Sequence, residues 1–328
     1  MADVKSRKKI GFIGWWAGRN IGDEYIQFCL RKAFGDEFKI KFIETSFEPN
    51  FWNLRNINSL DFLIIGGGGL FTKSPFFPFS HFNDWGHRLK VSFGFLGVGV
   101  QEISDKYKSV MRQLIERSAF FVVRDTGSFN LVNSLSPSSK ILKAPDLTFL
   151  YPYQVQRKTA QDKIGVNLRV WNFDQERTYD NGQWSQAINR LNKAKKPIPL
   201  SFKKGLDDRD ALRGIEGTKN DTFCIGLYED VAVMVGMRLH SLIFAAQNSI
   251  PVIGIAYTPK IPRFFSDLNL PEFCLKVSEY SRLESVFSEA LERSREIGSI
   301  LAHYTRNAEQ LLKARIEDIK NQIKNSPS

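Results

Sequence analysis

Short apolar runs that end in glycine alternate with amphipathic stretches along most of this chain, and this alternation constrains the fold most. Runs of this length suit buried strands, and the stretches between them have the period of helices. Such β–α units assemble into parallel sheets covered by helices. The sequence therefore predicts an α/β fold. The expected strands of the first half are residues 10–13, 38–43, 61–65, 91–98 and 120–123, with a short run at 140–142 closing it.

The second half repeats the pattern, with expected strands at residues 163–169, 197–201, 222–224, 232–237 and 251–255. Helices are expected near residues 23–33 and 105–117 in the first half and at 183–194, 207–215 and 239–247 in the second. Residues 282–323 read as helix, interrupted near Gly298. We predict two doubly wound Rossmann-like domains facing a cleft, followed by a helical tail that can pack back on the first domain. The expected bounds are 1–153, 154–296 and 297–328.

The 328 residues are 42% hydrophobic and 25% charged, the balance of a soluble globular protein with a sizeable core. The net charge of +11 is spread along the chain without a long basic arm, which argues against a nucleic-acid-binding tail. No segment reaches the roughly 20 apolar residues of a membrane span, and the N-terminus lacks the apolar stretch of a signal peptide. We expect a cytoplasmic protein. Its three cysteines are widely spaced in apolar surroundings, so each is expected to be buried (Cys29, Cys224 and Cys274).

Ligands of doubly wound sheets bind beyond the carboxyl ends of the strands, so the loops there are the candidate sites. The first such loop, residues 14–24, has neither the P-loop spacing nor the order of a dinucleotide fingerprint. One interpretation is a tight turn at Gly22 with Asp23 capping the next helix. The other places Asn20 and nearby backbone N–H groups against an anion or a sugar.

Four consecutive glycines, residues 66–69, follow the third strand and suggest close backbone approach to a ligand or a neighbouring loop. The densest aromatic segment of the chain comes next, at 70–85. It suits an aromatic wall for sugars or a lipid contact, but packing between the halves is favoured for most of its Phe residues. His81 in this segment is a candidate substrate-binding residue. Further along, Arg124 and Asp125 are expected to form an ion pair at a helix start.

The strongest constellation lies in the second half. Arg169 ends one expected strand, and residues 236–241 end another and begin a helix. Arg238 offers a planar fork for phosphate or carboxylate, and the helix start adds backbone N–H groups. His240, two residues on, can move a proton near neutral pH. Tyr257 and Lys260 follow the next strand and are expected at the same site.

The segments at 236–246 and 251–257 resemble the signature of the polysaccharide pyruvyl transferase family. Matching segments occur in the same order at residues 20–24, 66–70, 97–100, 123–125, 145–146 and 165–169, so the resemblance covers about residues 10–265. The family implies a glycosyltransferase-B-like architecture. It also implies transfer of the pyruvyl group of phosphoenolpyruvate to two hydroxyls of a glycan sugar, with formation of a ketal and release of phosphate.

Arg238 and His240 match the family's donor-binding and catalytic pair, with Arg169 as a second cationic contact. His240 is then the candidate to protonate the methylene carbon or to assist phosphate departure, and Asp23 or Glu24 the candidate base for a sugar hydroxyl. The expected donor site comprises Arg169, Arg238, Leu239, His240, Ser241, Tyr257 and Lys260. The expected acceptor site, on the first domain, comprises Asn20, Asp23, Glu24, Gly67, Gly68 and His81.

Two features depart from the family pattern: Lys73 stands where members often have an acidic residue, and the Phe-rich loop at 76–82 does not map onto it. No metal cluster is evident, and no cofactor is expected besides phosphoenolpyruvate as co-substrate. The expected acceptor is a glycan or a lipid-linked oligosaccharide. Residues 5–9 and the Lys-rich tail suit contact with an anionic membrane. The alternatives are a nucleotide-sugar-dependent glycosyltransferase of the same architecture and a non-catalytic glycan-binding relative.

Overall fold

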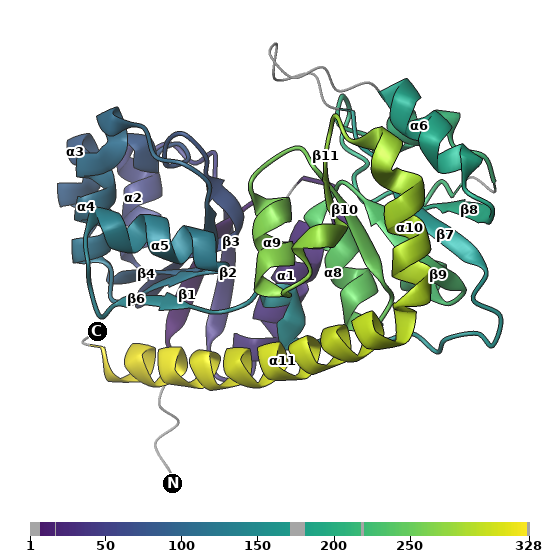
Figure 1. Ribbon diagram of the computed structural model, residues 1–328. Helices are drawn as coiled ribbons and strands as arrows, with labels where there is room; N and C mark the ends of the chain where they lie inside the picture. Colours follow the sequence, from purple (N-terminus) through teal and green to yellow (C-terminus); the bar gives the residue numbers. More distant parts are fainter. Residues whose placement is uncertain (1–6, 17, 171–180, 218–219, 327–328) are drawn as a thin grey trace, which may run out of the picture. The chain divides into compact units, whose positions relative to one another are not determined.

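The computed structural model describes residues 7–16, 18–170, 181–217 and 220–326, which form two α/β units (Figure 1). Unit 1 consists of Met1–Ala17, Asp23–Leu150 and Gln310–Ser328, and unit 2 of Gly18–Gly22 and Tyr151–Glu309. Lys5, in the basic N-terminal segment, lies outside the described residues.

Unit 1 contains a six-stranded parallel sheet in the order β2-β1-β3-β4-β5-β6. Every residue of β4 is buried, as expected for a strand covered on both faces. The strands are β1 (Lys9–Gly14), β2 (Lys39–Glu44), β3 (Phe62–Phe71), β4 (Phe93–Val100), β5 (Phe121–Val123) and β6 (Ile141–Lys143). The helices are α1 (Ile21–Phe34), α2 (Phe51–Asn58), α3 (Phe82–Trp85), α4 (Lys108–Arg117) and α5 (Thr126–Leu135).

The glycine run was expected to follow a strand but lies inside β3. The ladder to β4 continues through Gly66 and Gly68 and shifts register before Phe71. Gly67 and Gly68 have φ angles of 82° and 105°, a region that only glycine enters readily. Because this backbone still pairs with β4, the strand extends further than its apolar residues predicted.

Unit 2 contains a five-stranded parallel sheet in the order β11-β10-β9-β7-β8. Helices α8 and α9 lie on one side of its central strands and α10 on the other (Figure 1). The strands are β7 (Lys163–Asn167), β8 (Ala194–Pro197), β9 (Val231–Gly236), β10 (Val252–Ala256) and β11 (Cys274–Lys276). The helices are α6 (Asn181–Arg190), α7 (Asp208–Ala211), α8 (Leu239–Gln247), α9 (Lys260–Asp267) and α10 (Leu283–Glu292).

Three expectations for unit 2 were wrong. The strand expected at 197–201 is β8, which ends at Pro197; beyond it the backbone N–H of Leu200 bonds to the Asp208 side chain instead of a strand. The strand expected at 222–224 is absent from this segment, and the helix expected at 207–215 contains only α7 and a 3-10 turn. Strand β11 was not anticipated because only three residues pair.

A final helix, α11 (Ser294–Asn325), is continuous through Gly298, so the interruption expected there was wrong. The break comes earlier, at Arg293 between α10 and α11. Within unit 1, the last turns of α11 bury a stripe at helical spacing: Leu312, Ile316, Ile319 and Ile323. Lys320 Nζ lies 2.7 Å from Glu37 Oε1, and Lys324 also pairs with Glu37.

The aromatic segment after β3 packs within unit 1, although packing between the halves was expected. Phe79, Phe82 and Trp85 belong to the core cluster of that unit, and Phe79 lies 5.3 Å from Trp85 between ring centroids. Phe77 is half-exposed. The segment therefore serves chiefly as core.

The cysteines differ in exposure. Cys29 is buried as expected, but Cys224 is exposed and Cys274 is partly buried. Burial, with a smaller effect of Glu279, raises the pKa of the Cys274 thiol to about 12. In the part of the chain that the structure describes, no helix is both long and apolar enough to cross a membrane.

Candidate functional site

The sheet of unit 2 has a topological switch between β7 and β9. The chain leaves β7 toward β8 on one side and returns to β9 on the other, and ligands bind at the carboxyl ends of strands at such a point. Asn167, the last residue of β7, is paired with Gly236, the last residue of β9. Arg238 follows two residues later, so the arginine of the main candidate motif lies at the switch.

A buried hydrogen-bond network fixes Arg238. Its Nε lies 2.7 Å from both carboxylate oxygens of Asp208, and its Nη2 lies 2.6 Å from Asp208 Oδ1. Nη2 also donates to the carbonyl of Leu206 at 3.1 Å. Asn167 completes the network: its Oδ1 accepts from the Arg238 backbone N–H at 3.0 Å, and its Nδ2 donates to Asp208 Oδ2 at 3.1 Å.

Asp208 is a site residue that sequence reasoning missed. It is fully buried on α7, and its Oδ2 also accepts from the backbone N–H groups of Leu200 and Ser201. An ionised carboxylate in this position is satisfied on every side, which is what a buried charge requires. The available signal was the acidic start of the expected helix at 207–215, but nothing local linked it to Arg238.

His240 lies in the first turn of α8 and is buried. Gly22 packs directly on its ring, because a Cβ built at Gly22 would lie 1.8 Å from His240 Nδ1. The segment carrying Gly22 is attached to unit 2 by backbone pairing: Asn20 bridges Ser201, and the Ile21 N–H donates to Leu200 at 2.9 Å. The glycine loop of the first half thus contributes one wall of the histidine site.

Leu239 and Ser241, the other expected donor residues of this turn, are buried. Ser241 Oγ donates to the Arg238 carbonyl at 2.7 Å, and the Ser241 carbonyl accepts from the Tyr228 hydroxyl at 3.1 Å. These bonds hold the strand-to-helix turn that presents Arg238 and His240.

Tyr257 follows β10 and contacts the other two cations of the expected donor site, Arg169 and Lys260. Arg169 Nη1 donates to the Tyr257 hydroxyl at 2.9 Å, and the Arg169 guanidinium lies 4.9 Å from the centre of the ring. Lys260 Nζ lies 5.3 Å from the same ring centre. Burial alone raises the pKa of Tyr257, but the positive charges of Lys260, Arg169 and Arg238 outweigh it and lower the pKa to about 7.

The structure brings together some of the expected acceptor residues. In unit 1, a Cβ built at Gly68 would lie 3.4 Å from Asp23 Oδ1, and one built at Gly67 would lie 2.7 Å from Ile26 of the same helix. The start of α1 therefore approaches the glycine run. Glu24 is exposed in the first turn of α1.

The capping interpretation of Asp23 was wrong, since α1 begins at Ile21 and Asp23 lies inside its first turn. Asn20 has the capping position instead, with its Oδ1 accepting from the Gly22 N–H at 3.2 Å. His81 is exposed, and its Nδ1 lies 3.0 Å from the Ser80 hydroxyl within the aromatic segment. Within the part of the chain that the structure describes, His81 contacts Ser80 and Phe77 and none of the other expected acceptor residues.

Arg124 forms the expected pair with Asp125 at 3.8 Å, but it is more than a helix-start contact. It is buried, its Nη1 lies 3.6 Å from Asp146 Oδ2, and a Cβ at Gly99 would come within 2.7 Å of its guanidinium. Asp125 separately caps α5 through the Ser128 N–H at 2.7 Å. Arg124 thus places a buried positive charge at the carboxyl ends of β4 and β5.

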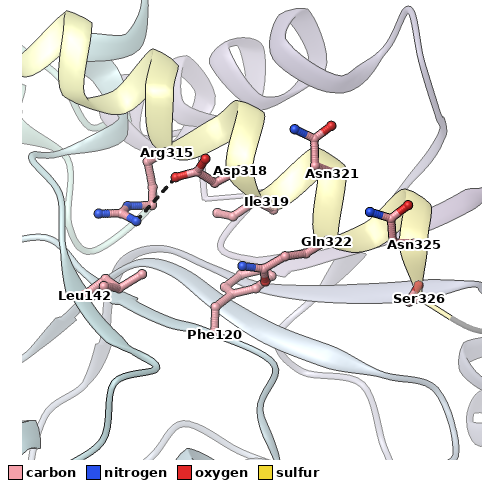
Figure 2. A pocket seen from close by; sticks show the side chains of 9 residues that line it. All are labelled: Phe120, Leu142, Arg315, Asp318, Ile319, Asn321, Gln322, Asn325 and Ser326. Atoms are coloured by element: carbon pink, nitrogen blue, oxygen red, sulfur yellow. Dashed lines mark ion pairs between the residues drawn. The ribbon is translucent and has the colours of Figure 1, made fainter.

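A hollow of about 530 Å³ lies elsewhere in unit 1, between the last turns of α11 and the start of β5 (Figure 2). Figure 2 shows Arg315 pointing toward Asp318, and Arg315 Nη1 lies 3.6 Å from Asp318 Oδ2. Phe120 and Leu142 line the opposite wall. Because Phe120 immediately precedes β5, the hollow is at the amino end of that strand and contains none of the expected site residues. Among the described residues, no group of three His, Cys, Asp or Glu has a metal-binding arrangement.

The chain resembles a known protein family in sequence. A family model described as "Polysaccharide pyruvyl transferase" matches residues 20–259, which include the Arg238–His240 turn. No curated protein matches the chain significantly in sequence.

Solved structures resemble it in fold at low identity. A glycosyltransferase from Rickettsia africae ESF-5 has a TM-score of 0.60 at 12% identity, covering 98% of this chain and 100% of that one. S. aureus MnaA in a co-structure with UDP has a TM-score of 0.61 at 13% identity, covering 98% and 99%. The UDP-GlcNAc 2-epimerase of Neisseria meningitidis has 0.60 at 12% identity, covering 97% and 100%. These likenesses confirm the expected glycosyltransferase-B-like α/β fold.

Proposed function

This chain belongs to the polysaccharide pyruvyl transferase family, and we propose that it transfers the pyruvyl group of phosphoenolpyruvate to two hydroxyls of a glycan sugar. The observation that carries the proposal is the convergence of Arg169, Arg238 and Lys260 on Tyr257 at the carboxyl edge of one sheet. A donor with a carboxylate and a phosphate needs several cations close together. The site supplies them.

The reaction balances without an oxidant or reductant. The methylene carbon of the donor gains a proton and becomes a methyl group, and the first sugar hydroxyl adds to the neighbouring carbon. Phosphate leaves with its bridging oxygen, and the second hydroxyl closes the ketal. The two hydroxyl protons balance the one on the methyl group and the one on phosphate. No redox cofactor is called for.

His240 is the residue that we assign to proton transfer, either to the methylene carbon or to the departing phosphate. It lies in the turn that follows Arg238, within reach of the same anion-binding edge, and Gly22 fixes its ring. Arg238 itself is held by Asp208, so its guanidinium is oriented before the donor arrives. Preorganised charges of this kind stabilise a transition state without reorganising during the reaction.

Asp23 is the candidate base for a sugar hydroxyl, since its carboxylate lies near Gly68 at the start of α1. We further propose that the acceptor is a glycan or lipid-linked oligosaccharide and that the protein works in the cytoplasm, at times against an anionic membrane. The net charge of +11 favours such contact. Binding to anionic vesicles that weakens with salt is the expected result, and equal binding to neutral vesicles would contradict the electrostatic contact.

The test is phosphate release from phosphoenolpyruvate in the presence of candidate sugars. His240→Gln should lower the rate by about 10²–10⁴-fold, the usual size of general acid–base effects. Arg213→Gln is the matched control, because Arg213 is exposed in the same unit and forms an ion pair with the exposed Asp210 at 2.7 Å. Equal rates for the two variants would reject the role of His240.

Ligand-induced stabilisation separates the competing functions. Phosphoenolpyruvate should raise the melting temperature, because a ligand that binds only the folded state stabilises it. Stabilisation by UDP-sugars alone would favour a nucleotide-sugar glycosyltransferase. Binding of glycans with no phosphate release from any donor would favour a non-catalytic relative.

A further inference from the structure

Tyr257 has surroundings that differ from those of an ordinary buried tyrosine. Tyr257 is only 2% exposed, yet its hydroxyl accepts from Arg169 at 2.9 Å. The Arg169 guanidinium and the Lys260 ammonium lie 4.9 Å and 5.3 Å from the centre of its ring. Cations this close to a phenol favour its charged form, the phenolate, over the neutral form.

The charges near Tyr257 come from several elements. Arg169 follows β7, Arg238 follows β9 and Lys260 begins α9, and the three together lower the pKa of Tyr257 to about 7 against the opposing effect of burial. Asp208 is the buried carboxylate of this group, and it is engaged by Arg238. The other charged or titratable residues on elements that pack against β10 are His240 of α8, Arg263 and Asp267 of α9, Glu272 of the 3-10 turn at 271–273, Cys274 and Lys276 of β11, and Glu284, Glu289 and Glu292 of α10.

Tyr228 provides the contrast within the same unit. It is also fully buried, but its hydroxyl donates to the Ser241 carbonyl at 3.1 Å, and burial raises its pKa. The pKa values of two buried tyrosines in one unit are therefore shifted in opposite directions. The difference lies in the cations, not in the burial.

We propose that Tyr257 is a phenolate in the donor-free protein at neutral pH and takes up one proton when an anionic donor binds beside Arg169 and Lys260. The donor's negative charge then compensates the cations, and burial favours the neutral phenol again. The new O–H bond forms on Tyr257 Oη with a proton that the buffer acid releases through the solvent, and no electron is transferred. The identity of the donor rests on the proposed function; the phenolate does not.

This exchange of charge predicts how donor affinity depends on pH. Since the protonated form of Tyr257 binds an anion better, affinity should fall as pH rises through the pKa of about 7, approaching tenfold per pH unit. The effect should appear in KM, because it concerns binding. In Tyr257→Phe this part of the pH dependence should be absent.

The first experiment measures phenolate directly, by ultraviolet difference absorption of the donor-free protein between about pH 6 and 9. Wild type and Tyr228→Phe should both ionise one tyrosine near pH 7, and Tyr257→Phe should not. Inorganic phosphate should reduce the signal. Absence of phenolate in wild type over this range, or its persistence in Tyr257→Phe, would overturn the proposal.

The second experiment measures proton uptake, by calorimetric titration with phosphoenolpyruvate at about pH 8 in buffers of different ionisation enthalpy. Wild type and Tyr153→Phe, which lacks a tyrosine that is 43% exposed in unit 2, should take up close to one proton per donor bound, and Tyr257→Phe close to none. Equal uptake by wild type and Tyr257→Phe would reject the proposal. If phosphoenolpyruvate does not bind at all, the proposed function fails while the phenolate titration still stands or falls by itself.

Discussion

At the scale of single residues, the site depends on contacts that leave no room for substitution. Gly22 reads in the sequence as a turn glycine, and the backbone there does begin a helix. In the structure its missing side chain matters for another reason, because the imidazole of His240 occupies that space. The residue type was apparent from the sequence, but the reason for it was not.

Gly22→Ala should therefore lower phosphate release by at least about tenfold while the protein remains folded, because the added methyl group displaces the His240 ring from the position that we propose for proton transfer. Gly18→Ala is the matched control in the same segment, since its Cβ would meet nothing closer than Asn20 Cβ at 4.0 Å. The comparison is made by initial rates together with circular dichroism. Equal rates for the two variants would show that the ring has space to move.

At the scale of elements, Asp208 links three strand ends. From the short helix α7 it binds Asn167 at the end of β7, the backbone after β8 and Arg238 after β9. The sequence predicted the strands on either side of the switch, because each is a continuous apolar run. It did not predict the irregular segment after β8, where a side chain replaces a neighbouring strand as hydrogen-bond partner.

Asp208→Asn should destabilise unit 2 by about 3–5 kcal/mol, because it leaves the buried Arg238 charge without its counter-charge. Asp210→Asn, on the same short helix, removes only the exposed pair with Arg213 and should cost within about 0.5 kcal/mol. Urea denaturation followed by tryptophan fluorescence measures both. A denaturation midpoint of Asp208→Asn that matches that of Asp210→Asn would contradict the role given to this carboxylate.

At the scale of the whole molecule, the C-terminal helix has residues in both units. Its first part is assigned to unit 2, and Gln310–Ser328 belong to unit 1, where they bury an apolar stripe and pair with Glu37. Part of the positive charge of the tail is therefore neutralised by ion pairs with Glu37. Only the remaining cations are available to a membrane or another anionic partner.

Ile316→Ala should destabilise unit 1 by about 2–5 kcal/mol, because it removes a side chain from a packed interior. Leu311→Ala, on the same helix, should change stability by no more than about 0.5 kcal/mol, since Leu311 is 41% exposed. Thermal unfolding of the two variants tests this. Similar losses in both, or none in either, would mean that the stripe does not stabilise the unit.

The sequence by itself determined the two parallel sheets, most of their strands and the turn that carries Arg238 and His240. Apolar runs, helical periods and a short motif are local patterns, and they act over a few residues at a time. The tertiary structure alone decided which groups meet at the site. Asp208 reaches Arg238, Gly22 admits His240, and Arg169 charges the surroundings of Tyr257 across 88 residues of chain. Such pairings depend on strand order, which no local pattern encodes.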